Sequence, residues 1–230
     1  MLFVMFSLDA DQSINVLTTP ALSLLLLGGL LGYLLGSVPT AFIVVRWKSR
    51  LDIRNAGSGN VGTLNSYQVT GSKAVGILVL ALDFLKGYLS AVGASILFDR
   101  SFAAVAAAGV GSVLGHNFPV WLRFKGGRGL ATAAGVFMYL SPLALAVWGL
   151  CWAVGFGAVR NVNVANVAAT VVLVFLAWIL PDPFLMGVVD GGASVTGIRL
   201  FVTCTLTVVL VGHHKPFAQY LKELRTGIKE

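Results

Sequence analysis

Long apolar stretches alternate with short polar segments along most of the chain. Seven of these stretches are candidate membrane-spanning helices: residues 22–45, 74–98, 102–115, 129–140, 143–159, 164–180 and 200–212. About 20 helical residues cross the ~30 Å hydrocarbon core of a bilayer. The third, fourth and seventh stretches are shorter, so they need a tilt or a start inside a polar loop. The pattern predicts an all-α integral membrane protein, a seven-transmembrane-helix bundle with short interfacial segments, forming one domain over residues 1–230.

Composition narrows the class of protein further. Of the 230 residues, 57% are hydrophobic and only 11% are charged, whereas a soluble domain has about 25% charged residues. A soluble globular protein and a disordered chain are both excluded. The net charge of +7 does not indicate a nucleic-acid partner, because membrane proteins collect Lys and Arg in cytoplasmic loops. Cys151 and Cys204 lie in apolar stretches and predict neither a disulfide nor a metal site.

The distribution of basic residues predicts an orientation. All but three of the 16 Lys and Arg residues fall in one set of connecting segments; the exceptions are Arg100, Arg199 and Lys86. The positive-inside rule then places the N-terminus outside and the C-terminus in the cytoplasm. An odd number of crossings is required, which agrees with seven. No signal peptide is expected, since the first charges, Asp9 and Asp11, are acidic.

The first apolar stretch has two features of its own. Gly28, Gly32 and Gly36 are spaced by four residues, which predicts close packing of another helix against this stripe. Pro39 removes a backbone donor. Ser37 and Thr40 could compensate locally or could face a polar cavity, and the sequence leaves both interpretations open.

The second apolar stretch contains an ion pair. Asp83 and Lys86 are three residues apart and therefore share one face of a helix. Ionisable residues inside a span are rare, costly and usually functional. We favour a functional pair over one that only stabilises packing, because an isolated buried pair gains little against its desolvation cost.

Two segments outside the spans are rich in glycine. In residues 52–62, Arg54, Ser58, Gly59 and Asn60 stand among further glycines. Glycine lets backbone N–H groups approach a ligand closely, concave sets of such groups bind anions, and arginine can add a bidentate fork. A flexible connector is the alternative.

The other glycine-rich segment, residues 115–129, is the stronger candidate. It contains His116 and ends in Lys125, Gly126, Gly127, Arg128 and Gly129. Its aromatic residues suit a short interfacial segment. A helix N-terminus with glycines and two cations is suited to binding a phosphate. An ordinary cytoplasmic loop would explain the charges, but neither the glycines nor the neighbouring histidine.

Together these segments predict a phosphate-binding site at the cytoplasmic face, with positive charge from Arg54, Lys86, Lys125 and Arg128. The substrate would combine an anionic head group with an acyl chain. Familiar hydrolase, nucleotide-binding and metalloprotease motifs are missing, and carboxylates are too few for a two-metal site. Neither a metal nor a cofactor is expected. Acyl transfer would need an activated donor, with catalysis by orientation and charge stabilisation.

These motifs resemble the bacterial acyl-phosphate:glycerol-3-phosphate acyltransferases, the PlsY family. The resemblance covers residues 36–132, where four motifs occur in the family's order and spacing. It implies a monomeric enzyme of the bacterial cytoplasmic (inner) membrane that moves a fatty acyl group from acyl phosphate to the 1-hydroxyl of glycerol 3-phosphate, giving lysophosphatidate. Its partners would be these two substrates and membrane lipid, without nucleic acid.

The resemblance also implies roles for individual residues. Catalytic roles fall on Ser37, Lys86 and His213. Substrate contacts fall on Arg54, Ser58, Gly59, Asn60, His116, Lys125, Gly126, Gly127 and Arg128. Either His213 or a substrate phosphate could accept the proton released by the attacking hydroxyl.

Four positions depart from the family pattern. Gln68 replaces an arginine, Asn163 and Asn166 replace serines, and Pro216 replaces an asparagine whose side-chain hydrogen bonds proline cannot make. Two alternatives therefore stay open: a divergent paralogue with another acceptor, or a non-catalytic transporter of organic phosphates or lipids. Transporters usually contain paired repeats, and the sequence shows none.

Overall fold

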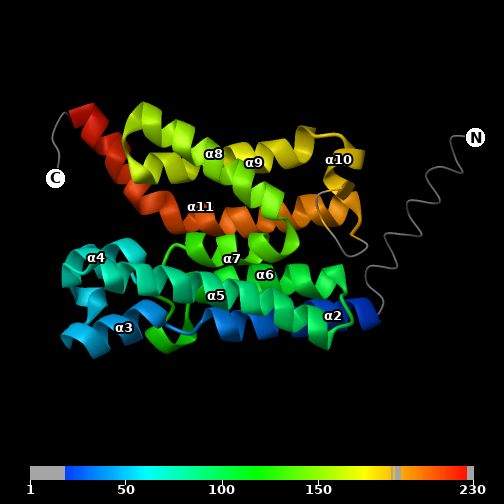
Figure 1. Cartoon of the computed structure of the whole chain (residues 1–230), viewed down its shortest axis with the longest axis horizontal. Coiled ribbons are helices and arrows are strands. Elements are labelled where there is room, and N and C mark those ends of the chain that lie inside the picture. The colour runs from blue at the N-terminus through cyan, green and yellow to red at the C-terminus, as the bar shows by residue number, and fades with distance from the viewer. Residues whose placement is uncertain (1–18, 188, 190–192, 227–230) are drawn as a thin grey trace, which may run out of the picture.

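The computed structural model describes residues 19–187, 189 and 193–226, and every regular element in this part is helical. Asp9 and Asp11 lie outside it. The main helices are α2 (Thr19–Gly36), α3 (Thr40–Ser49), α4 (Thr63–Thr70), α5 (Lys73–Leu97), α6 (Phe102–Asn117), α7 (Leu130–Leu140), α8 (Pro142–Val159), α9 (Val162–Ile179), α10 (Asp182–Gly187) and α11 (Val195–Thr226). The long helices run along one axis, and α2 starts at the end of the bundle opposite to the one where α11 finishes (Figure 1).

Six helical segments of the described residues are long and apolar enough to span a membrane. They are Ala21–Ser49, Lys73–Leu97, Phe102–Leu122, Pro142–Val159, Val162–Ile179 and Val195–Thr226. Six of the seven predicted spans thus correspond to helices of spanning length. The fourth corresponds to α7, whose 11 residues rise only ~16 Å. The chain is an integral multi-pass membrane protein.

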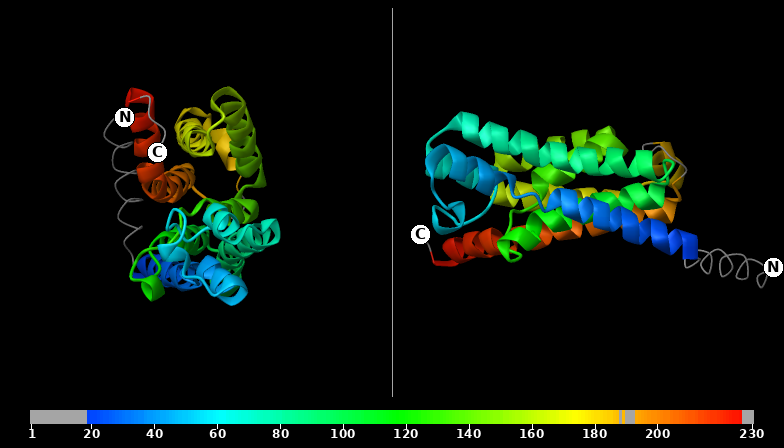
Figure 2. Two further views of the ribbon diagram at one scale, coloured as in Figure 1. Left: turned by 90° about the vertical axis from the view of Figure 1, so that its left-hand side faces the viewer. Right: turned by 90° about the horizontal axis from the view of Figure 1, so that it is seen from below.

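The first predicted span is not one continuous helix. Helix α2 ends at Gly36 and α3 starts at Thr40, so Ser37, Val38 and Pro39 form a break. The physical reason is Pro39, which has no N–H to donate to the preceding turn. The right-hand view of Figure 2 shows the two helices joined by this short non-helical link.

The last helix is much longer than the predicted stretch 200–212. It continues to Thr226 with Pro216 inside it. Hydropathy identifies only the apolar part of a helix that faces the hydrocarbon core. The polar residues after 212 continue the same helix. His213 therefore lies in the middle of α11 rather than at its end.

The predicted glycine stripe is a helix contact. A side chain at Gly28, Gly32 or Gly36 would collide with the backbone of α6, at Ala104, Ala108 and Ser112 respectively. The prediction of close packing is confirmed. Because α2 and α6 approach backbone to backbone, the break after Gly36 is held against the C-terminal half of α6.

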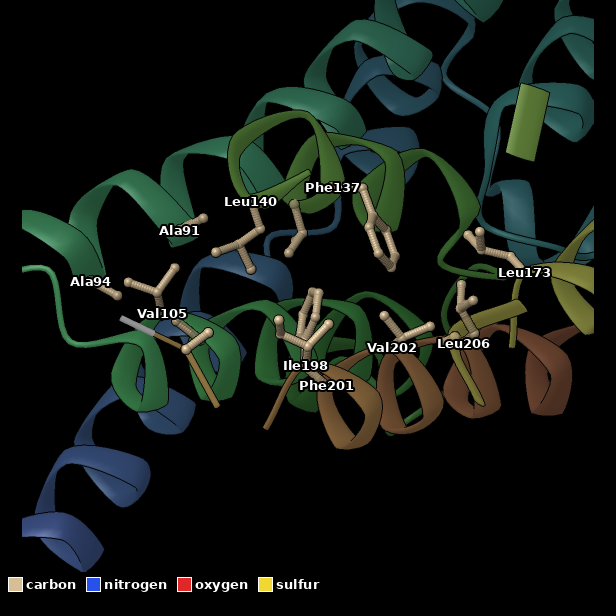
Figure 3. Close-up of a cluster of buried hydrophobic side chains, with 14 residues drawn as sticks. Ala91, Ala94, Val105, Phe137, Leu140, Leu173, Ile198, Phe201, Val202 and Leu206 are labelled. Atoms are coloured by element: carbon tan, nitrogen blue, oxygen red, sulfur yellow. The ribbon is translucent and has the colours of Figure 1, made fainter. Parts of the chain in front are cut away.

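A hydrophobic core joins the short α7 to its neighbours. Phe137 and Leu140 of α7 face Ile198, Phe201 and Val202 of α11, and all five are buried (Figure 3). The Phe137 and Phe201 rings lie 5.3 Å apart between centroids. This packing fixes α7 between α5 and α11, so the loop that precedes α7 is held at the polar end of the bundle.

Candidate active site

A single carboxylate organises the polar end of the bundle. Oδ1 of Asp83, in α5, accepts a hydrogen bond from the Thr40 hydroxyl at 2.5 Å and pairs with Nζ of Lys86 at 2.9 Å. The Nδ1 atom of His116, in α6, lies 3.4 Å from the same oxygen. Asp83 is 1% exposed, and a charge so buried must be paired and hydrogen-bonded. One carboxylate therefore ties α3, α5 and α6 together.

The helix break after Gly36 belongs to the same cluster. Lys86 Nζ also donates to the carbonyl of Val38 in the break, at 3.0 Å. The Ser37 hydroxyl is buried and has no hydrogen-bond partner among the described residues. Ser37, Thr40, Lys86 and His116 line one small cleft.

The glycine-rich loop 52–62 has a defined shape. Gly57 and Gly59 have φ of 58° and 70°, the left-handed region that glycine adopts without strain. The side-chain amide of Asn65, 1% exposed, donates to the carbonyls of Asn60 and Ala56 at 2.9 and 3.1 Å and accepts from the Ser58 N–H at 3.0 Å. The loop is thus held by a side chain of α4 rather than being a free connector.

Arg54 projects from this loop, but its guanidinium already has a partner. Its Nε and NH2 atoms donate to the two carboxylate oxygens of Asp52 at 2.9 and 2.7 Å. It also lies over the Phe42 ring, 5.1 Å from the centroid. Hydrogen bonds from Arg54 lower the pKa of Asp52 to about 2 and the carboxylate raises the pKa of Arg54. A phosphate at Arg54 would have to share the guanidinium with Asp52.

The loop between α6 and α7 differs from its predicted role in one respect. The amides of Gly126 and Gly127 donate to the carbonyls of Asn117 and His116 at 3.1 and 3.0 Å. These two N–H groups therefore cap the end of α6 and are not free for an anion. Both glycines are needed for the close approach, because a side chain at Gly127 would collide with the His116 ring.

The two glycine-rich loops touch each other. The amide of Val61 donates to the carbonyl of Gly126 at 3.4 Å, and both residues line the cleft with Lys86. Ser58, Gly59 and Asn60 precede this contact directly. Lys125 is exposed, and no interaction of its side chain occurs among the described residues. The predicted cationic residues of both loops thus gather around one end of the bundle.

Arg128 and His213 form a second group, on the α9–α11 side of the same loop. Arg128 donates to Oδ1 of Asn163 at 2.7 Å, and none of the ion pairs in the described part of the chain involves it. Its pKa is lowered by partial burial. A half-buried cation without a carboxylate partner favours an anionic ligand.

His213 is 2% exposed and both of its ring nitrogens have partners. Nδ1 lies 2.8 Å from the Val209 carbonyl and Nε2 lies 3.2 Å from the Asn166 side-chain nitrogen. Asn166 in turn accepts from the Trp152 indole N–H at 2.8 Å. Because the Val209 carbonyl can only accept, Nδ1 carries the proton and the lone pair of Nε2 accepts from Asn166.

Three residues that matter to this geometry were not predicted as site residues. Asn65, Asn166 and Trp152 make their contacts through side-chain hydrogen bonds between separate elements. The only sequence signal was a polar residue at a position facing other helices. Among the described residues, no three His, Cys, Asp or Glu side chains gather in a way that could hold a metal ion.

The fold and site define a class: a multi-pass membrane protein with a cationic cleft at one end of its bundle. A family model described as glycerol-3-phosphate acyltransferase matches residues 26–223. The chain therefore belongs to the glycerol-3-phosphate acyltransferase family, and the resemblance seen in the sequence is confirmed.

Curated relatives carry the same description. The chain is 34% identical over 192 residues to the glycerol-3-phosphate acyltransferase of Syntrophotalea carbinolica, covering 84% of this chain and 91% of that one. It is 41% identical over 174 residues to that of Rubrobacter xylanophilus, covering 72% and 83%.

Two crystal structures of PlsY, an integral membrane glycerol 3-phosphate acyltransferase, share the fold. The glycerol 3-phosphate form has a TM-score of 0.71 at 31% identity, covering 89% of this chain and 99% of that one. The lysophosphatidic acid form has a TM-score of 0.70 at 32% identity, covering 86% and 92%.

Proposed function

We propose that this chain is a membrane glycerol-3-phosphate acyltransferase of the PlsY family, transferring a fatty acyl group from acyl phosphate to the 1-hydroxyl of glycerol 3-phosphate. The product is lysophosphatidate. The observation that carries the proposal is the cleft lined by Ser37, Lys86 and His116 beside two cationic glycine-rich loops, in which the Ser37 hydroxyl has no partner within the part of the chain that the structure describes. The family relationship supports the acceptor and the product, since solved relatives are described with glycerol 3-phosphate and with lysophosphatidic acid.

The reaction needs no protein nucleophile. Acyl phosphate is a mixed anhydride, so the acceptor oxygen attacks the acyl carbon, the bond from that carbon to the phosphate oxygen breaks, and inorganic phosphate leaves. Lys86 and Lys125 stabilise the charge on the departing phosphate. The Ser37 hydroxyl, which has no partner within the described structure, donates to the acyl oxygen as negative charge develops on it.

The proton of the attacking hydroxyl can go to His213 or to a phosphate oxygen of the substrate. The phosphate oxygen of acyl phosphate is the better acceptor of the two. His213 would need a free ring lone pair, and that of Nε2 accepts from Asn166. His213 then serves to hold Asn166 and α9 in place beside Arg128. We assign the phosphate of the acceptor to Arg54 and Arg128, one predicted substrate-contacting arginine from each glycine-rich loop.

We also propose the full topology as seven crossings of one membrane domain. We place the fourth crossing at α7, whose 11 residues pack between α5 and α11 in the bundle. The concentration of Lys and Arg around the polar end supports a cytoplasmic C-terminus and an external N-terminus, in the cytoplasmic membrane of a bacterium. A monomer is sufficient, because one chain supplies every residue of the site.

The direct test is an in vitro assay of purified protein with glycerol 3-phosphate and three rival donors: acyl phosphate, acyl-CoA and acyl carrier protein. We expect lysophosphatidate from acyl phosphate alone. Lys86→Ala and Lys125→Ala abolish product formation, whereas Lys48→Ala, at an exposed lysine on α3, leaves it unchanged. Full activity in both site variants would reject the assignment. Flux of organic phosphate into proteoliposomes without product would favour a transporter instead.

A further inference from the structure

A second cleft lies at the end of the bundle opposite the polar site. It encloses about 420 Å³ and is lined by Val92, Ser95, Ile96, Arg100, Phe102, Val105, Tyr139 and Leu140. These residues come from the end of α5, the turn into α6, the start of α6 and the end of α7. The size falls in the range of ordinary ligand sites, which is ~300–1,000 Å³.

The lining of this cleft is amphipathic. Most of its wall is aliphatic or aromatic, but the side chains of Arg100, Ser95 and Tyr139 also line it. No hydrogen bond or ion pair of these three polar groups is found within the described residues. The backbone of Arg100 is held at the end of α5, since its N–H donates to the Ser95 carbonyl at 2.8 Å. Three polar side chains that make no hydrogen bond or ion pair within the described part of the chain therefore line the same, otherwise apolar, cleft.

This combination suits one chemical class of ligand. A guanidinium with two hydroxyls binds a phosphodiester through charge-assisted hydrogen bonds, and the adjoining wall of Val92, Val105 and Leu140 suits an acyl chain. Arg100 lies in the turn between two candidate spans, which is the level of lipid head groups. We propose that this cleft binds an anionic diacyl phospholipid from the membrane leaflet opposite the polar site.

The site is separate from the proposed acyltransfer chemistry. Lys86 and Ser95 are nine residues apart on α5, which corresponds to ~14 Å along the helix. A phosphate held by Arg100 is therefore out of reach of the Lys86 ammonium. The lipid is a bound partner of the fold and neither substrate nor product, so this proposal goes beyond the proposed function.

The test uses the full chain, purified in detergent and stripped of lipid. Dioleoyl phosphatidylglycerol and dioleoyl phosphatidylcholine are titrated separately, and bound lipid is counted by native mass spectrometry. We expect one tightly bound phosphatidylglycerol and a rise in Tm of several degrees. Phosphatidylcholine should bind at least about tenfold more weakly, because its net charge is zero.

The variants assign the lipid to this cleft. Arg100→Gln should weaken phosphatidylglycerol binding about tenfold or more, and Arg100→Lys should retain most of it. Tyr139→Phe keeps the ring that packs edge-on against Tyr88 and should show a smaller loss. Arg50→Gln is the matched control, since Arg50 is exposed and has the same φ of 57° as Arg100. Unchanged binding by Arg100→Gln, or equal binding of both lipids to the unaltered chain, would overturn the proposal.

Discussion

The side-chain amide of Asn166 donates to Nε2 of His213 across 3.2 Å, joining α9 to α11 inside the bundle. Asn166 keeps this orientation because its oxygen accepts from the Trp152 indole at 2.8 Å. The imidazole is therefore held neutral, with its remaining lone pair occupied. An asparagine at a position where the family resemblance expects a serine is thus the partner of the histidine predicted to be catalytic.

Replacing Asn166 with leucine should destabilise the protein. The change keeps a similar volume but leaves the Trp152 N–H and His213 Nε2 without partners, which costs about 1–3 kcal/mol. Thermal unfolding in detergent measures the loss, with the exposed Asn55→Ala as a control expected to stay near the unaltered Tm. A large loss of activity at an unchanged Tm would show that Asn166 contacts substrate instead.

The second prediction concerns His213 itself. A general base contributes about 10²–10⁴ to rate, so its loss should be visible in kcat. We expect His213→Gln to lower kcat by less than about 10² and to leave the acid limb of the pH–rate profile where it was. A larger fall in kcat, together with disappearance of that limb, would restore His213 as the proton acceptor.

The sequence predicted the apolar stretches and the glycine stripe well, because both are periodic and depend on near neighbours. Gly28 and Gly32 could be placed from spacing alone, and Asp83 with Lys86 from their shared helix face. The contact of Asn166 with His213 could not, because 47 residues separate them and one asparagine has no periodicity. The capping of α6 by the amides of Gly126 and Gly127 could not be predicted either, because it depends on how the loop folds back onto the helix end.

A third prediction tests the ion pair at the centre of the site. Asp83→Asn leaves Lys86 buried at 8% exposure without a counter-charge, and breaking a buried pair from one side costs about 3–5 kcal/mol. In the Asp83→Asn background, Lys86→Met should cost much less than it does alone. A double-mutant cycle on the free energy of unfolding measures the coupling. If the two substitutions change the free energy of unfolding additively, Asp83 and Lys86 do not stabilise each other.

The Asp52–Arg54 pair gives a pH prediction. The folded-state pKa of Asp52 is lowered to about 2 from 3.8, chiefly by the Arg54 side chain. A lowered carboxyl pKa contributes stability that is complete above the unfolded value and is lost as the pH falls through the folded value. The difference in Tm between the unaltered chain and Asp52→Asn should thus stay constant above pH 5 and shrink between about pH 4 and 2. A difference that changes near pH 7 would contradict this.

The sharpest steric prediction is at Gly127, where an added methyl group would collide with the His116 ring. His116 cannot retreat easily, because it is 7% exposed and its Nδ1 lies beside Asp83. Gly127→Ala should therefore cost about 1–3 kcal/mol of stability through overpacking, and it should lower activity by displacing His116 from the cleft. Gly157→Ala on α8 is the control, since no atom of the described residues lies within 4 Å of its added methyl group and alanine favours a helix by about 0.5–1 kcal/mol over glycine. Measuring Tm and lysophosphatidate formation for both variants separates the steric effect from a general response to losing a glycine. Equal behaviour of the two variants would show that the His116–Gly127 contact does not shape the site.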